Sequence, residues 1–172
     1  MPLNTSGFYD VNTGTTPDEV ALKFKFPFPV KIKGWYGRIT PAAGGDFQAI
    51  LYDSDGTTAL QTISYDGDIR LSNATGNYID YFSSSQAILK DTFYRLAVKP
   101  TTTTTITLGG NTHTAAAILD ALPGGQNLHE STRTDAGAWT DTTTDRPQIG
   151  LIIDSADDAV GGSAATTAYT FA

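Results

Sequence analysis

The stretch from Val20 to Ile39 restricts the fold of this chain most strongly. Its even positions from 20 to 32 are all apolar, and its polar odd positions include Lys23, Lys25, Lys31 and Lys33. Alternation with a period of two is typical of a β-strand with one face in a core and the other in water. One strand of this length would span roughly 40 Å, too long for a small domain, and Pro27 and Pro29 cannot donate to a β-ladder. The pattern therefore predicts two strands joined by a Pro-Phe-Pro bend.

The composition is that of an acidic, threonine-rich globular domain. The 172 residues suit one domain, and the charged share of 17% is below the usual ~25%. The formal net charge of −7 argues against binding to nucleic-acid phosphates, which needs a basic stripe. The chain has no cysteine, which excludes disulfide and thiolate chemistry. Its first residues lack signal-peptide features and no apolar run approaches ~18 residues, so we expect synthesis in the cytoplasm and no membrane span.

Short apolar segments separated by turn residues predict further strands along the chain. A helix is predicted at 112–122, where alanines follow a capping threonine and Pro-Gly-Gly ends the run. Eight to ten short strands with one late helix favour an all-β fold, an antiparallel two-sheet β-sandwich that is jelly-roll-like. The expected strands beyond the opening pair are 46–53, 59–65, 77–82, 93–99, 101–108, 127–133, 137–141 and 148–154.

The two ends of the chain differ in composition from the middle. Residues 1–19 are polar apart from a few bulky groups such as Phe8 and Tyr9, and residues 155–172 are small and polar until Tyr169 and Phe171. Such segments bury too little apolar surface to offset their ordering entropy. We therefore expect an N-terminal arm, a β-sandwich domain at 20–154 and a C-terminal tail, with the aromatic tips available to a partner.

Residues that could carry catalysis or hold a metal are few. His113 and His129 stand in no nucleophile or zinc motif. The acidic strings at 53–55, 66–68 and 154–158 could offer oxygen ligands to calcium, but ordinary β-turns explain them better. We therefore predict no enzymatic activity, no metal site and no cofactor.

Aromatic side chains offer a second type of site. Faces of aromatic rings beside amide and carboxylate groups are the usual equipment for carbohydrate recognition, while core packing is the alternative explanation for the same residues. A glycan-binding platform and core packing thus stay open for Trp35, Tyr36, Tyr78, Tyr81 and Trp139.

Several strings together resemble a known group of proteins. They include FPFPVKIKG, DFQAILYDSDGT, FYRLAVKPTTTTTIT, LDALPGG, STRTDAGAWTDTTTDRP and GLIID, which span about residues 20–154. In these strings the chain resembles β-sandwich virion proteins encoded by tailed bacteriophages and viral metagenomes. The resemblance implies a structural role in the virion, either as a capsid decoration protein or as part of a tail or fibre. It implies no catalytic residues.

We therefore expect a phage capsid decoration protein that binds the major capsid protein, or other virion proteins, as a homo-oligomer such as a trimer. The alternative is a carbohydrate-binding module of a tail or fibre. The lysines of the opening stretch are either a solvated strand face or a surface that attracts an acidic partner. The Pro-Phe-Pro bend and the register change at Gly34-Trp35 are the expected contact points. The expected partner-binding residues are Phe8, Tyr9, Lys23, Lys25, Trp35, Tyr36, Tyr169 and Phe171.

Overall fold

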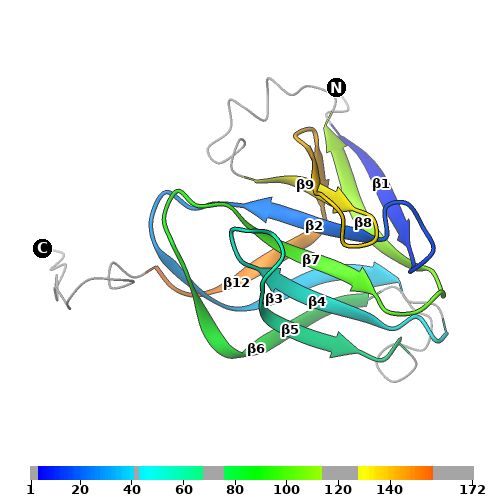
Figure 1. The fold of residues 1–172 in the computed structure, drawn as a ribbon, viewed down its shortest axis with the longest axis horizontal. Helices are drawn as coiled ribbons and strands as arrows, with labels where there is room; N and C mark the ends of the chain where they lie inside the picture. The colour runs from blue at the N-terminus through cyan, green and yellow to red at the C-terminus, as the bar shows by residue number, and fades with distance from the viewer. Residues whose placement is uncertain (1–3, 41–42, 68–75, 114–127, 157–172) are drawn as a thin grey trace, which may run out of the picture.

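The fold is all β and consists of two antiparallel six-stranded sheets packed face to face (Figure 1). The computed structural model describes residues 4–40, 43–67, 76–113 and 128–156. Sheet A contains β1 (Asn4–Val11), β8 (Ile106–His113), β3 (Val30–Thr40), β12 (Ile149–Ser155), β6 (Gly76–Ile88) and β11 (Asp145–Pro147). Sheet B has the order β10 (Thr140–Thr142), β9 (Leu128–Arg133), β2 (Glu19–Phe24), β7 (Tyr94–Pro100), β4 (Phe47–Tyr52) and β5 (Ala59–Tyr65).

This architecture confirms the prediction of an antiparallel β-sandwich, while its jelly-roll connectivity stays a prediction. The expected hairpin of β4 and β5 is present, and β7 is a central strand between β2 and β4. The expected ribbon near the C-terminal end is also present as β9 and β10. β4 and β7 were predictable because each has a clear apolar face bounded by turn residues.

The opening stretch forms two strands, β2 and β3, and the chain passes from sheet B to sheet A between them. Val20, Phe24, Val30 and Ile32 are fully buried, as their even positions predict. Residues 25–29 make the crossing, because two prolines there prevent the ladder of either sheet from continuing. Lys23 therefore belongs to sheet B, Lys31 and Lys33 belong to sheet A, and Lys25 lies in the crossing.

A bulge in β3 decides which aromatic ring enters the core. The register of β3 on β6 shifts between Ile32 and Gly34, so Trp35 becomes buried and Tyr36 faces outward. Glycine is required at the bulge, since a Cβ on Gly34 would lie 2.2 Å from the backbone oxygen of Asp80. Simple alternation from Val30 would have placed these two rings the other way round.

Aromatic side chains from both sheets meet in the centre of the sandwich. The Trp35 indole donates a hydrogen bond of 2.8 Å to the hydroxyl of Tyr65. The Tyr65 ring stacks on Phe47 at a centroid distance of 4.7 Å, and Tyr78 meets Phe47 edge-on at 5.2 Å. This cluster ties β3 and β6 of sheet A to β4 and β5 of sheet B.

The structure differs from the expectation at both ends of the domain. Asn4–Val11 is not an arm but the strand β1, which pairs along its whole length with β8. The predicted helix start is also wrong, because Thr112 and His113 continue β8. The rest of that helix, 114–122, and residues 157–172 of the expected tail lie outside the described residues.

Candidate functional site: the outer face of sheet A

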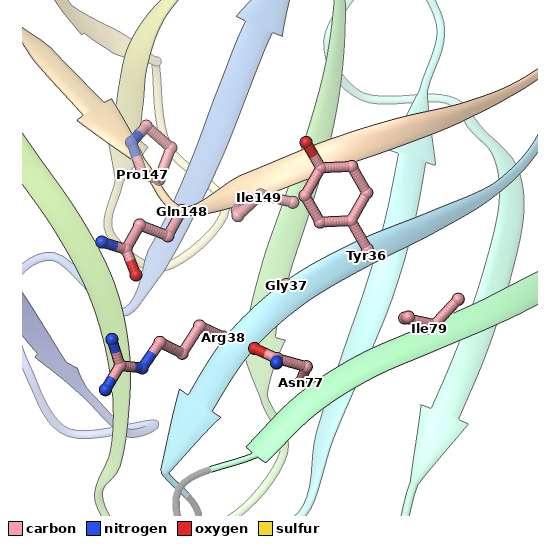
Figure 2. Close-up of a pocket in the computed structure, with 8 residues that line it drawn as sticks. All are labelled: Tyr36, Gly37, Arg38, Asn77, Ile79, Pro147, Gln148 and Ile149. Atoms are coloured by element: carbon pink, nitrogen blue, oxygen red, sulfur yellow. The ribbon is translucent and has the colours of Figure 1, made fainter.

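A pocket of about 540 Å³ opens on the outer face of sheet A (Figure 2). Strands β3 and β6 and the β11–β12 segment supply its walls, and we call it the sheet A pocket. Its lining residues are Tyr36, Gly37, Arg38, Asn77, Ile79, Pro147, Gln148 and Ile149.

The pairing of β3 with its neighbours sets the position of each wall. Arg38 lies opposite Asn77, and Tyr36 lies opposite Ile79. In Figure 2 the Tyr36 ring and the Arg38 guanidinium lie on opposite sides of Gly37. The pocket therefore has an apolar and aromatic side and a polar, cationic side.

The Tyr36 ring is held against the backbone of β12. Tyr36 pairs with Gly150 across the strands, and a Cβ on Gly150 would lie 2.1 Å from Cζ of Tyr36. The ring thus occupies the space that a side chain at this position would need. Tyr36 remains 51% exposed, so part of its ring surface is available to a ligand.

The polar side chains of the pocket are not used by the described part of the protein. Arg38, Asn77 and Gln148 make no side-chain hydrogen bond or ion pair with any residue that the structure describes. The backbone of Gln148 is fixed, because its N–H donates to the Gly109 carbonyl at 2.7 Å and its carbonyl accepts from the Arg38 N–H at 3.1 Å. A guanidinium, two amides and an aromatic face therefore line one pocket and can bind a ligand that has both polar groups and an apolar face.

The sequence identified only Tyr36 among these residues. Arg38, Asn77 and Gln148 occupy ordinary polar positions on or beside strands, and such positions are indistinguishable from a solvated face in one sequence. Alternation places Ile79 on the same face of its strand as Tyr81, but it does not say which face is exposed, and nothing in the sequence pairs that strand with β3.

Trp35 and Tyr9 are not surface contact residues. Trp35 is fully buried. Tyr9 is half-buried and its hydroxyl donates to the Glu130 carboxylate. Burial, followed by the hydrogen bond and charge of Glu130, raises the pKa of Tyr9 well above its usual range. Burial likewise raises the pKa of Glu130, although the Tyr9 hydrogen bond opposes this.

The other expected contact residues lie apart from the pocket or outside the description. The Phe8 backbone pairs with Gly109, while its side chain lies outside the described residues. Tyr169 and Phe171 lie outside them altogether. Of the remaining sugar-platform candidates, Tyr78 is buried and Tyr81 is exposed.

The four lysines of the opening stretch do not form one surface, which corrects that expectation. Lys23 bonds Asp141 at 2.5 Å on the outer face of sheet B, and Lys33 lies 3.9 Å from Asp154 on sheet A. The crossing between β2 and β3 thus puts the Lys23–Asp141 and Lys33–Asp154 ion pairs on different sheets. Lys25 and Lys31 have no carboxylate partner among the described residues.

The outer face of sheet B carries a polar cluster of its own. The buried Ser131 hydroxyl donates to Asp141 at 2.7 Å and accepts from Arg95 Nε at 2.9 Å. A serine nucleophile needs an exposed hydroxyl next to a base, whereas this hydroxyl is buried and already occupied. We therefore interpret the cluster as a structural network.

A buried ion pair lies next to this network. Arg133 Nε donates to Glu19 at 2.6 Å, and both residues are buried. The guanidinium lies 4.4 Å from the Trp139 ring and donates to the Tyr52 hydroxyl at 2.8 Å. Burial alone would lower the pKa of Arg133, but the hydrogen bond and charge of Glu19 outweigh it and raise that pKa. Trp139 therefore covers sheet B instead of offering a free face to a sugar.

The acidic turn at 53–56 is built from its own hydrogen bonds. Asp55 accepts from the N–H groups of Thr57 and Thr58, both at 2.8 Å, and from the Thr58 hydroxyl at 2.6 Å. The Thr58 bonds, followed by that of Thr57, lower the pKa of Asp55 to about 2. Within the described ranges, no three histidine or carboxylate residues are grouped as metal ligands.

An exposed apolar pair marks one end of the sandwich. Val30 pairs with Ile88, and the Asp91 N–H donates to the Phe26 carbonyl at 2.7 Å. These bonds bring the β2–β3 and β6–β7 links together, as the left of Figure 1 shows. Phe28 and Leu89 are 47% and 53% exposed there. We call this region, residues 25–31 and 88–91, the bend end.

Comparisons with known proteins add no assignment. No protein-family model matches the chain, and no curated protein matches it. Among the described segments there is no helix with the length and apolar character needed to cross a membrane.

Proposed function

We propose that the protein is a non-enzymatic structural protein of a phage virion, a capsid decoration protein that binds the major capsid protein through the bend end. The exposure of Phe28 and Leu89 at one end of the sandwich carries this proposal. Large apolar side chains gathered on a surface are typical of protein–protein contacts. The resemblance of residues 20–154 to virion proteins supplies the identity of the partner.

The charges around the apolar pair indicate an acidic partner surface. Lys25, Lys31 and Lys90 belong to the bend end and have no carboxylate partner among the described residues. These three lysines outnumber the one acidic residue of the bend end, Asp91, in a chain of net charge −7. Such a local excess of positive charge steers association with an acidic surface, and salt weakens this steering by screening it. Complementary charge around an apolar centre is also the usual arrangement of a specific interface.

Co-sedimentation with purified capsid shells tests the proposal. Phe28→Ser and Leu89→Ser together should weaken shell binding about tenfold or more, because each removes an apolar side chain whose full burial is worth roughly 1.5–3 kcal/mol. Tyr81→Ser is the matched control, since Tyr81 is 61% exposed but lies on the outer face of sheet A. Equal binding by the double variant and the wild type would contradict the proposal.

A second function, sugar binding, is favoured by the sheet A pocket. Its exposed Tyr36 ring and three polar side chains without partners among the described residues match the usual composition of a glycan site. The pocket and the bend end are different surfaces, so a protein attached by the bend end keeps the pocket accessible. A glycan array probed with wild type and Tyr36→Ala tests this function: saturable binding should disappear in the variant, and no binding by the wild type would contradict it.

A further inference from the structure

We infer that the sheet A pocket is specific for a carboxylate-bearing sugar, such as a uronic acid residue of a polysaccharide. This inference rests on the second proposed function, sugar binding, and it names the ligand class. The carboxylate would bind Arg38, the sugar ring would stack on Tyr36, and the hydroxyl groups would bind Asn77 and Gln148.

The charge of the pocket favours an anion. Arg38 is the only charged residue among the eight that line the pocket, and it has no ion pair with any described residue. A guanidinium presents two parallel N–H groups that match the two oxygens of a carboxylate. A neutral sugar would leave this cation without a partner, whereas an acidic sugar neutralises it.

The spacing between Tyr36 and Arg38 fits a sugar ring with a carboxylate attached directly to it. Tyr36 and Arg38 are two residues apart on β3, so their side chains leave the sheet on the same face about 6.6 Å apart. A pyranose stacked on Tyr36 can therefore place its exocyclic group at the guanidinium. Gly150 strengthens this arrangement, because the Tyr36 ring already lies against it and loses little freedom on binding.

The two amides supply the recognition of hydroxyl groups. Asn77 and Gln148 each offer one acceptor and two donor hydrogens, and neither amide is used by the described part of the protein. Both lie on the polar side of the pocket with Arg38 (Figure 2). A free phosphate or a simple carboxylate could also bind the guanidinium, but neither could use the Tyr36 face together with both amides.

Titration of the full chain with small probes tests the inference. Methyl β-glucuronide is the acidic sugar, methyl β-glucoside its neutral counterpart, and acetate and inorganic phosphate the anions without a sugar ring. NMR or calorimetry should show saturable binding of the glucuronide and at least tenfold weaker binding of the other three. Equal binding of the glucoside would overturn the inference but leave sugar binding standing. Binding of neither sugar would overturn both, and tighter binding of phosphate would identify an anion site instead.

Variants locate the site. Arg38→Gln should weaken glucuronide binding at least tenfold while the weak glucoside affinity stays unchanged, and Tyr36→Ala should abolish binding of both. Lys99→Gln is the matched control, because it removes the same charge from β7 of the other sheet and should leave the Kd unchanged. Thermal unfolding confirms that each variant is folded. If Arg38→Gln bound glucuronide like the wild type, the inference would be wrong.

Discussion

The two outer faces of the sandwich differ in whether their polar side chains have partners within the described part of the protein. On sheet B, Arg133 is buried between Glu19, Tyr52 and Trp139, and every strong donor of that cluster has a partner within the protein. On sheet A, Arg38 stands in an open pocket, and its side chain has no hydrogen-bond or ion-pair partner among the described residues. The same type of side chain therefore stabilises the fold on one face and is available for binding on the other.

The difference arises from which segments cover each sheet. The chain between β9 and β10 places Trp139 over Tyr52 at a ring distance of 5.9 Å, and this closes the outer face of sheet B around a small second core. No described segment covers the sheet A pocket in this way. Candidate binding residues are therefore better identified by unused hydrogen-bonding groups than by residue type.

The two arginines offer the largest test of this comparison. Arg133→Met should lower the free energy of unfolding by about 3–5 kcal/mol, because it leaves the Glu19 carboxylate buried without its counter-charge. Arg38→Met should change it by less than about 0.5 kcal/mol, as is usual at an exposed site. Urea unfolding measures both. Similar losses would contradict the distinction, and Glu19→Gln combined with Arg133→Met should recover part of the stability.

Two glycines of sheet A allow a comparison of its inner and outer faces, because Gly37 contacts the buried Trp35 ring and Gly150 contacts the exposed Tyr36 ring. A Cβ on Gly37 would lie 2.6 Å from the buried Trp35 ring, so Gly37→Ala should cost about 1–3 kcal/mol by overpacking. Gly150→Ala meets only the exposed Tyr36 ring, which can swing into solvent, so its cost should stay below about 1 kcal/mol. Glucuronide binding should nevertheless be lost in Gly150→Ala, and unchanged binding would show that the resting position of the ring is irrelevant.

Two ion pairs give a smaller contrast. The Lys23–Asp141 pair is short and mostly covered, whereas the Lys33–Asp154 pair is longer and more exposed. Lys23→Gln should therefore cost up to about 1 kcal/mol and Lys33→Gln close to nothing. Chemical denaturation at low and high salt compares the two variants. A larger loss of unfolding free energy from Lys33→Gln than from Lys23→Gln would contradict the prediction.

A pH comparison isolates His129 on sheet B. Burial, then the nearby charge of Lys23, lowers the pKa of His129, although Asp141 opposes this and Arg146 and Arg95 add to it. The unfolded chain therefore binds more protons than the folded one below pH ~6.5, and stability should fall as the pH drops through this value. His129→Gln should show a shallower fall between pH 7.5 and 5.5, by about one proton at most. His113 is present in both proteins, so an unchanged slope would exclude His129 as the source.

The sequence predicted the elements whose apolar alternation is clear, but not those that depend on a partner strand. β1 escaped prediction because Asn4–Val11 lacks alternation, and its stability comes from pairing with β8, where Gly110 leaves room for the Tyr9 ring. The site shows the same limit. Tyr36 was identified as an aromatic residue, but the bulge at Gly34 decides that Tyr36 and not Trp35 faces outward. A register shift of one residue reverses the faces of a strand. The sequence indicates a register change at Gly34-Trp35, but not which of the two rings faces outward.

Gln148 has a consequence for how the pocket responds to a ligand. β11 pairs with β8 and β12 pairs with β3, and the Gln148 backbone bonds to both β8 and β3 between them. This residue therefore marks a seam between two halves of sheet A. A ligand that binds both Arg38 and Gln148 would link the two halves and reduce their movement relative to each other. Slower amide hydrogen exchange at Arg38 and Gln148 thus reports occupancy directly, even for a ligand that binds weakly.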